Sequence, residues 1–81
     1  MTVRVKNKVL ELIQQRELAE NRRIPIAEIA RESGVPRATV HFWIETPYVA
    51  KFDSATVARF CAYFGCELSD LLELEPEGVD A

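Results

Sequence analysis

The sequence has no long hydrophobic run, few cysteines and a single histidine. No apolar stretch approaches the roughly 18 consecutive residues that a transmembrane helix needs. The first residues, MTVRVKNKV, lack the apolar block and cleavage site of a secretory signal peptide. Cys61 and Cys66 with one histidine are too few for a zinc site or a disulfide framework. We therefore expect a soluble, cytoplasmic protein with reduced cysteines, without a metal or cofactor and without a membrane partner.

The length and the charge distribution restrict the architecture and the partner. The chain has 81 residues, of which 48% are hydrophobic and 28% charged, so we expect one small globular domain over residues 1–81. Residues 1–51 hold nine Lys or Arg against six Glu, whereas residues 52–81 hold one Arg against seven acids. This asymmetry is compatible with a charged partner and equally with the solvation of two faces.

Apolar residues recur at helical spacing along most of the chain. They predict helices over about residues 7–21, 25–33, 36–45 and 53–64, and a last short helical turn over 68–72. Residues 1–6 are expected to form an N-terminal arm, and residues 75–81 an acidic tail that frays. The fold class predicted from this pattern is all-α with five helices.

The stretch from Pro25 to Glu45 predicts a helix-turn-helix. Pro25 and Pro36 suit the first turns of two helices, and Gly34 can take the left-handed conformation that ends the first of them. In the second helix, "PRATVHFWIE", the inward stripe is Val40, Trp43 and Ile44. Because successive residues point about 100° apart, His41 and Phe42 must leave the core while Trp43 enters it.

Two segments of the sequence resemble one known family. "GVPRATV" is similar to the Gly-Val-Ser-Arg-x-Thr-Ile pattern of Cro and repressor helix-turn-helix domains, also called the xenobiotic-response-element family of bacterial regulators. "KFDSATVARFCAYFGCELSDLLELE" is similar to the closing segment of the same family. Together the resemblance covers roughly residues 7–75. It implies a compact, five-helix, lambda-repressor-like domain of prokaryotic or phage type that binds double-stranded DNA.

The resemblance also implies which residues meet the DNA. The helix over residues 36–45 would enter the major groove while the preceding helix crosses the backbone. The groove-facing positions of the family correspond to Pro36, Arg37, Ala38, His41 and Phe42. Thr39 corresponds to a frequent phosphate contact. The loop that usually touches the sugar-phosphate chain supplies Thr46, Tyr48 and Lys51.

Each outward side chain has an alternative interpretation. Arg37 can make a bidentate contact to guanine, or it can be a solvated arginine or the partner of a nearby acid. His41 can contact a base edge or a phosphate, or it can be a surface residue that takes no part in binding. Phe42 can meet thymine methyl groups, dock into a protein groove, or fold back onto the loop over residues 46–51.

Two departures from the family pattern reduce the number of hydrogen-bond donors. Ile26 stands where many relatives have a Gln that reaches the DNA backbone, and Pro36 replaces the capping Ser. We therefore expect modest affinity from one copy and use as a homodimer through the N-terminal arm or the last helix. The leading hypothesis is a sequence-specific transcriptional regulator. The alternative is a protein-interaction module, antitoxin-like or regulator-binding. We do not expect an enzyme, because no set of residues offers a nucleophile together with a base.

Overall fold

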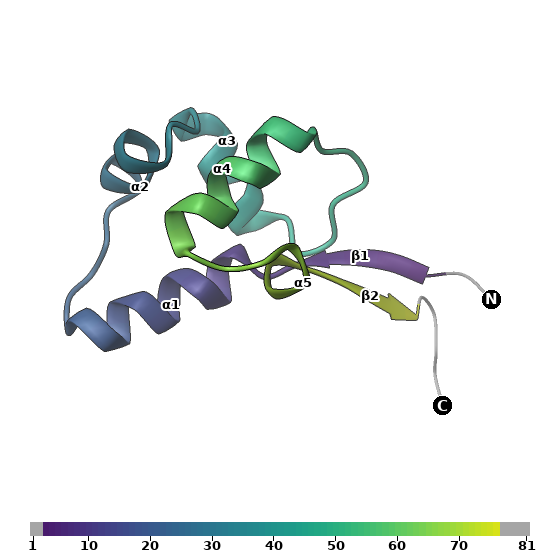
Figure 1. The fold of residues 1–81 in the computed structure, drawn as a ribbon, viewed down its shortest axis with the longest axis horizontal. Coiled ribbons are helices and arrows are strands. Elements are labelled where there is room, and N and C mark those ends of the chain that lie inside the picture. Colours follow the sequence, from purple (N-terminus) through teal and green to yellow (C-terminus); the bar gives the residue numbers. More distant parts are fainter. Residues whose placement is uncertain (1–2, 77–81) are drawn as a thin grey trace.

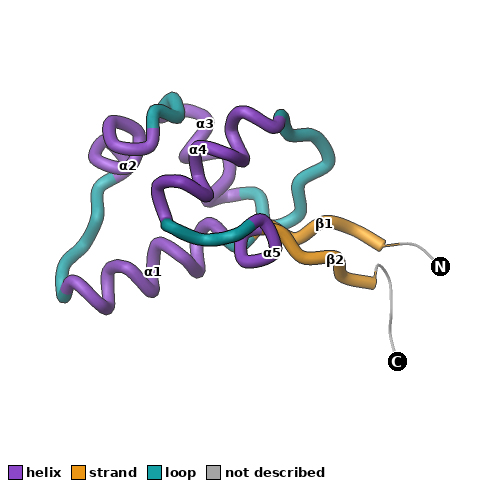
Figure 2. The backbone as a smooth tube through the Cα atoms, viewed as in Figure 1, coloured by secondary structure: helices purple, strands orange, loops and turns teal. Residues whose placement is uncertain are grey.

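The computed structural model describes residues 3–76, which form five helices and a two-stranded ribbon (Figure 1). In chain order the elements are β1 (Val3–Asn7), α1 (Val9–Glu20), α2 (Ile26–Ser33), α3 (Arg37–Glu45), α4 (Ser54–Phe64), α5 (Leu68–Leu71) and β2 (Leu72–Pro76). The four longer helices form the body, and the ribbon extends from one end of it (Figure 2). Within the described part, no helix is long and apolar enough to cross a bilayer.

The five predicted helices are confirmed, but the prediction of an all-α domain is wrong because of the ribbon. β1 and β2 pair antiparallel, with Val3 opposite Pro76 and Asn7 opposite Leu72. Of the predicted N-terminal arm, residues 3–6 therefore lie in a paired strand. Of the predicted tail, Glu75 and Pro76 lie in β2, and residues 77–81 lie outside the described part. Both strands alternate apolar and charged residues, but their pairing joins opposite ends of the chain and has no local signal.

Two predicted signals set the ends of the helices. Gly34 and Gly65 end α2 and α4 with φ of 81° and 65°, a region that costs other residues free energy because of their Cβ atom. Asp53 caps α4, since its carboxylate accepts a hydrogen bond from the amide of Thr56 at 3.3 Å. The pKa of Asp53 is lowered mainly by a hydrogen bond from the side chain of Thr56, and the bond from the Thr56 amide lowers it further.

One cluster of buried side chains joins the helices to each other and to the ribbon. Trp43 is 3% exposed, and its ring centroid lies 5.3 Å from that of the fully buried Phe60 of α4. The predicted burial of Trp43 and Val40 is thus confirmed. The buried hydrophobic residues are Val9, Ile13, Ile24, Ile29, Val35, Val40, Trp43, Val49, Val57, Phe60 and Leu71.

A buried amide, Asn7, ties the ribbon to the end of α3. Its Nδ2 donates to the carbonyl oxygens of Trp43 at 2.7 Å and Thr46 at 2.6 Å. Its Oδ1 accepts from the amide of Val9 at 2.8 Å, which satisfies the first amide of α1. Asn7 is only 4% exposed. Removal of its side chain would therefore leave each of these groups without a hydrogen-bond partner and without water to replace it.

We predict that Asn7→Ala lowers the free energy of unfolding by about 2–4 kcal/mol, because it leaves buried donors and acceptors unpaired. The measurement is urea unfolding followed by the fluorescence of Trp43. Gln14→Ala, which removes an exposed amide from α1, is the control and is expected to change stability by about 0.5 kcal/mol or less. Equal stability of the two variants would contradict the role given to Asn7.

Candidate nucleic-acid interface

The connection between α2 and α3 is short and fixed by local hydrogen bonds. The amide of Gly34 donates to the carbonyl of Ala30 at 2.9 Å, and the amide of Val35 donates to the Oγ of Ser33 at 3.1 Å. The side chain of Val35 is 1% exposed, so the turn itself contributes to the core. Two short helices joined in this way form a helix-turn-helix, as predicted.

The side of α3 that faces away from the core carries most of the predicted contact residues. Arg37, Ala38, His41 and Phe42 are exposed, and the preceding Pro36 is exposed as well. Thr39 is half-buried at the flank of this surface. Phe42 is 49% exposed, so much of its apolar side chain is open to a ligand. The structure therefore brings the α3 residues of the predicted site together on one surface.

His41 has a partner within the same helix. Its Nε2 lies 2.9 Å from the Oε2 of Glu45, one turn further along α3. Both side chains are more than half exposed, so the contact is open to solvent and weakly stabilising. The contact orients the imidazole along the outward surface of α3.

The amino-terminal ends of α2 and α3 lack side-chain caps. Pro25 and Pro36 occupy the two N-cap positions and offer no capping oxygen. In α3, Val40 is the first residue whose amide donates to a backbone carbonyl, that of Pro36 at 3.0 Å. Free amides and the helix dipole give both ends a partial positive charge that favours anions.

A shallow hollow lies between these two helix starts. It has a volume of about 240 Å³ and is lined by Ile26, Arg37, Ala38 and His41. Ile26 and Ala38 supply apolar walls, while Arg37 and His41 supply hydrogen-bonding groups. The combination can accept a flat group that has both a polar edge and a methyl group.

Arg37 and Lys51 differ from most cations of the chain in their pairing. Arg4, Lys6, Lys8, Arg16, Arg22 and Arg31 each lie within 4.0 Å of a carboxylate. Within residues 3–76, no carboxylate pairs in this way with Arg37, Lys51, Arg23 or Arg59. Arg37 and Lys51 are both exposed, so their charges are available to a ligand.

The loop after α3 is held by the ribbon. Thr46 accepts a hydrogen bond from Asn7 through its carbonyl, and Tyr48 forms a backbone bridge with Lys6. The hydroxyl of Tyr48 donates to Oε1 of Glu75 at 2.7 Å, and the guanidinium of Arg4 lies 3.8 Å from the centre of the Tyr48 ring. The hydroxyl of Tyr48 thus has an internal partner, whereas Lys51 lies free on the surface.

Sequence reasoning missed Asn7 and the strand that contains Glu75. A polar residue at the start of the first predicted helix was a weak signal for a capping role, and the alternation in LELEP was a signal for a strand. Neither signal pointed to α3. Only the folded chain shows that both residues position the end of this helix and its loop.

The sequence comparison assigns these features to a family. The profile of the Cro/C1-type helix-turn-helix DNA-binding domain matches residues 16–77. The chain belongs to this family. No curated protein and no solved structure gives a significant match. The α2–α3 unit described above lies inside the match, whereas β1 and the first half of α1 precede it.

Membership of the Cro/C1-type DNA-binding family supports DNA as the partner of this domain. Among residues 3–76, no cluster of three or more His, Cys, Asp or Glu side chains could hold a metal ion. The individual DNA contacts of Pro36, Arg37, Ala38, Thr39, His41, Phe42, Thr46, Tyr48 and Lys51 stay predictions.

We predict that Tyr48→Phe returns the pKa of Glu75 toward its ordinary value. The hydrogen bond from Tyr48 is the largest cause that lowers this pKa, and Lys6 and Arg4 lower it further. The contact therefore stabilises the fold above the ordinary carboxyl pKa and is lost as pH falls through the lowered one. Carboxyl NMR titration measures the shift. Tyr63→Phe is the control, and an unchanged pKa in Tyr48→Phe would refute the contact.

Proposed function

We propose that the protein is a sequence-specific DNA-binding transcriptional regulator that reads the major groove with α3. The observation that carries this proposal is the exposed surface of α3, with the unpaired Arg37, in a Cro/C1-type domain. We further propose that it acts in the cytoplasm of a prokaryote or of a phage-infected cell, because the family it resembles consists of regulators found there.

The dimensions and the polarity of the α2–α3 unit support this proposal. A major groove about 12 Å wide admits one α-helix, and its floor displays acceptors on guanine and methyl groups on thymine. The uncapped starts of α2 and α3 suit the flanking phosphates. In helix-turn-helix proteins the start of the second helix reaches the base edges while the first helix crosses the backbone.

Each outward side chain takes a specific role in the proposal. Arg37 donates two hydrogen bonds to the O6 and N7 of a guanine, the commonest specific contact in the major groove. Thr39, Thr46 and Lys51 contact phosphates and fix the register of α3 on the duplex. His41 contacts a base edge or phosphate through the imidazole edge that Glu45 leaves free.

Two of the predicted loop contacts differ in character. Lys51 is exposed and charged, so it adds electrostatic affinity that depends on salt. The hydroxyl of Tyr48 is committed to Glu75, so we assign Tyr48 the role of holding the loop in place rather than donating to a phosphate. With Ile26 at the start of α2, the surface has few donors for one copy to use.

We predict that Arg37→Glu abolishes sequence preference and weakens binding at least about a hundredfold, because it removes a bidentate contact and adds a charge that phosphates repel. The ligand is a duplex enriched from a random-sequence library, and fluorescence anisotropy at two salt concentrations gives the affinity. The control is Arg31→Glu, which makes the same charge change at a side chain that is 71% exposed near the C-terminal end of α2.

Arg31→Glu is expected to weaken binding only slightly and to keep the preference for the selected duplex. If both variants bind like the original chain, α3 does not read the groove. If no duplex binds the folded protein even at low salt, the regulator proposal fails as a whole.

The exposed ring of Phe42 favours a second candidate function. A phenylalanine that is 49% exposed can anchor the domain in a pocket of another protein. The alternative is then a protein-interaction module, antitoxin-like or regulator-binding, on the same fold. It differs from the first proposal in what Phe42 contacts, a thymine methyl group or a protein side chain.

We predict that Phe42 senses thymine methyl groups. Replacing each thymine of the selected duplex in turn by uracil, which lacks only the methyl group, is expected to weaken binding at one or two positions by about three- to tenfold. Phe42→Ala should weaken the thymine duplex by a similar factor and abolish the difference between thymine and uracil. A loss that is the same for thymine and uracil would instead leave Phe42 to the protein-interaction alternative.

A further inference from the structure

The two strands of the ribbon differ in the number of their neighbours. β1 pairs with β2 on one edge. On its other edge, the amide of Asn7 donates to the carbonyl of Pro47 at 2.7 Å. The amide of Val49 donates to the carbonyl of Val5 at 3.1 Å, so the loop after α3 covers this edge. β2 pairs with β1 alone among residues 3–76, and its outer edge is therefore open to another strand.

The register of the ribbon determines which backbone groups lie on the open edge. In an antiparallel pair, residues that bond to the partner strand through both amide and carbonyl alternate with residues whose groups point away from it. Lys8 and Leu71 continue the register by one position, and the amide of Lys8 donates to the carbonyl of Leu71 at 2.8 Å. Counting from this pair, Glu73 and Glu75 bond to β1, whereas the amide and the carbonyl of Leu74 point outward.

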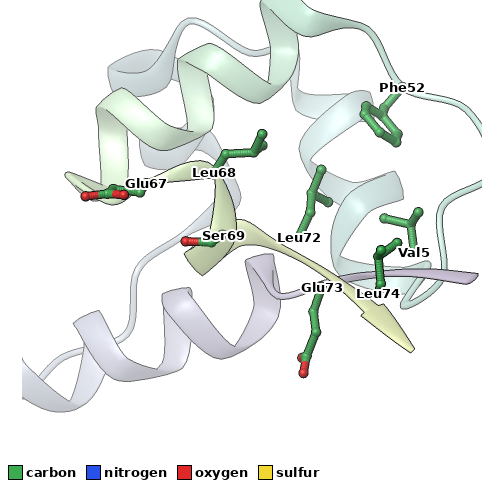
Figure 3. A pocket seen from close by; sticks show the side chains of 8 residues that line it. All are labelled: Val5, Phe52, Glu67, Leu68, Ser69, Leu72, Glu73 and Leu74. Atoms are coloured by element: carbon green, nitrogen blue, oxygen red, sulfur yellow. The ribbon is translucent and has the colours of Figure 1, made fainter. Parts of the chain in front are cut away.

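Apolar side chains lie on one side of the ribbon. Val5, Leu72 and Leu74 project from this side, and together with Phe52 and Leu68 they line a hollow of about 570 Å³ (Figure 3). Leu74 is 69% exposed and Leu68 is 56% exposed, so the hollow is open to solvent. Clustered apolar exposure of this kind marks an interaction surface, whereas scattered exposure is ordinary. A strand added to β2 would place every second side chain on this side.

Carboxylates lie on the opposite side of β2. Figure 3 shows Glu73 pointing away from the hollow, and Glu75 lies on the same side as Glu73 because side chains alternate along a strand. The side chain of Glu73 is 50% exposed, although Lys8 lies 3.4 Å from its carboxylate, and that of Glu75 is 33% exposed. An added strand therefore meets leucine side chains on one side of β2 and carboxylates on the other.

The carboxylates make a second copy of β2 a poor partner for this edge. Two β2 strands that pair antiparallel about Leu74 place Glu73 of one copy directly opposite Glu75 of the other. Like charges at directly opposite positions destabilise a sheet, whereas opposite charges stabilise it. The edge therefore favours a strand that carries Lys or Arg at the positions opposite Glu73 and Glu75.

We propose that the open edge of β2 binds an extended segment of another protein in which apolar residues alternate with Lys or Arg. The segment adds to the ribbon as an antiparallel strand. An apolar residue lies opposite Leu74 and exchanges hydrogen bonds with its amide and carbonyl, while its side chain lies on the side of the hollow. The basic residues before and after it lie opposite Glu73 and Glu75. This partner is independent of the proposed function, because it contacts β2 whereas the DNA contacts α3.

The probe is the capped peptide KVKVKVK, and the measurement is a titration of the whole chain followed by its backbone amide NMR signals. We expect saturable binding with a Kd below about 1 mM and a large shift of the Leu74 amide signal. The peptide KKVVVKK has the same composition and charge without the alternation. It is the control for charge alone and is expected to bind at least about tenfold more weakly.

Backbone methylation of the probe tests the alternation of the hydrogen bonds. Methyl groups on the valine amides remove the donors that face β2, whereas methyl groups on the lysine amides remove donors that face away from it. We expect valine methylation to raise the Kd at least about tenfold and lysine methylation to change it by less than about threefold. Equal losses of affinity in the two methylated peptides would overturn the proposed strand pairing.

Two variants of the chain test the edge itself. Leu74→Pro removes the outward amide hydrogen but leaves the bonds of Glu73 and Glu75 to β1, so we expect the ribbon to form and the probe no longer to bind. Leu74→Ala keeps the amide and is expected to weaken binding less. The amide signals of Glu73 and Glu75 check that the ribbon is intact, and the methylated probes decide the outcome if Leu74→Pro does not fold.

Three results overturn the proposal. The first is that KVKVKVK does not bind, or binds no more tightly than KKVVVKK. The second is that the largest signal shifts on binding lie outside β2. The third is a Leu74 amide signal that shifts with protein concentration in the absence of the probe, because a second copy then occupies the edge.

Discussion

The arrangement of the domain depends on the hydrogen bonds of one buried side chain, that of Asn7. Its amide joins the end of β1, the start of α1 and the end of α3, segments that are distant in the sequence. The backbone amide of Asn7 adds a bond to the carbonyl of Pro47 at 2.7 Å. A buried amide with all its partners present is directional, so it fixes an orientation that apolar packing alone leaves adjustable.

This constraint acts at the C-terminal end of α3, opposite the end that carries Arg37. The start of α3 is held differently, by the buried Val35 and by the left-handed Gly34. Between these two points, Val40 and Trp43 seat the helix in the core. The outward side chains therefore project from a helix that is fixed at both ends, which is the preorganisation that specific recognition needs.

The pairing of charges divides the surface into two regions with different chemistry. Around the ribbon, cations and carboxylates neutralise each other, as in the pairs Arg4–Glu75 and Lys8–Glu73. At α3 and its loop, Arg37 and Lys51 have no carboxylate partner within the described part of the chain. A net charge of −3 is thus compatible with a DNA-binding surface, because most acids lie elsewhere or are already paired.

The sequence by itself determined the local features of this protein. Helical spacing, Gly34, Gly65 and the Asp53 cap act within a few residues of themselves, so the five helices and the exposed side of α3 could be predicted from them. Only the tertiary structure decided the pairing of β1 with β2, the role of Asn7 and the contact from Tyr48 to Glu75. Each of these joins segments from distant parts of the chain, and such pairings depend on how all the helices pack together rather than on any local preference.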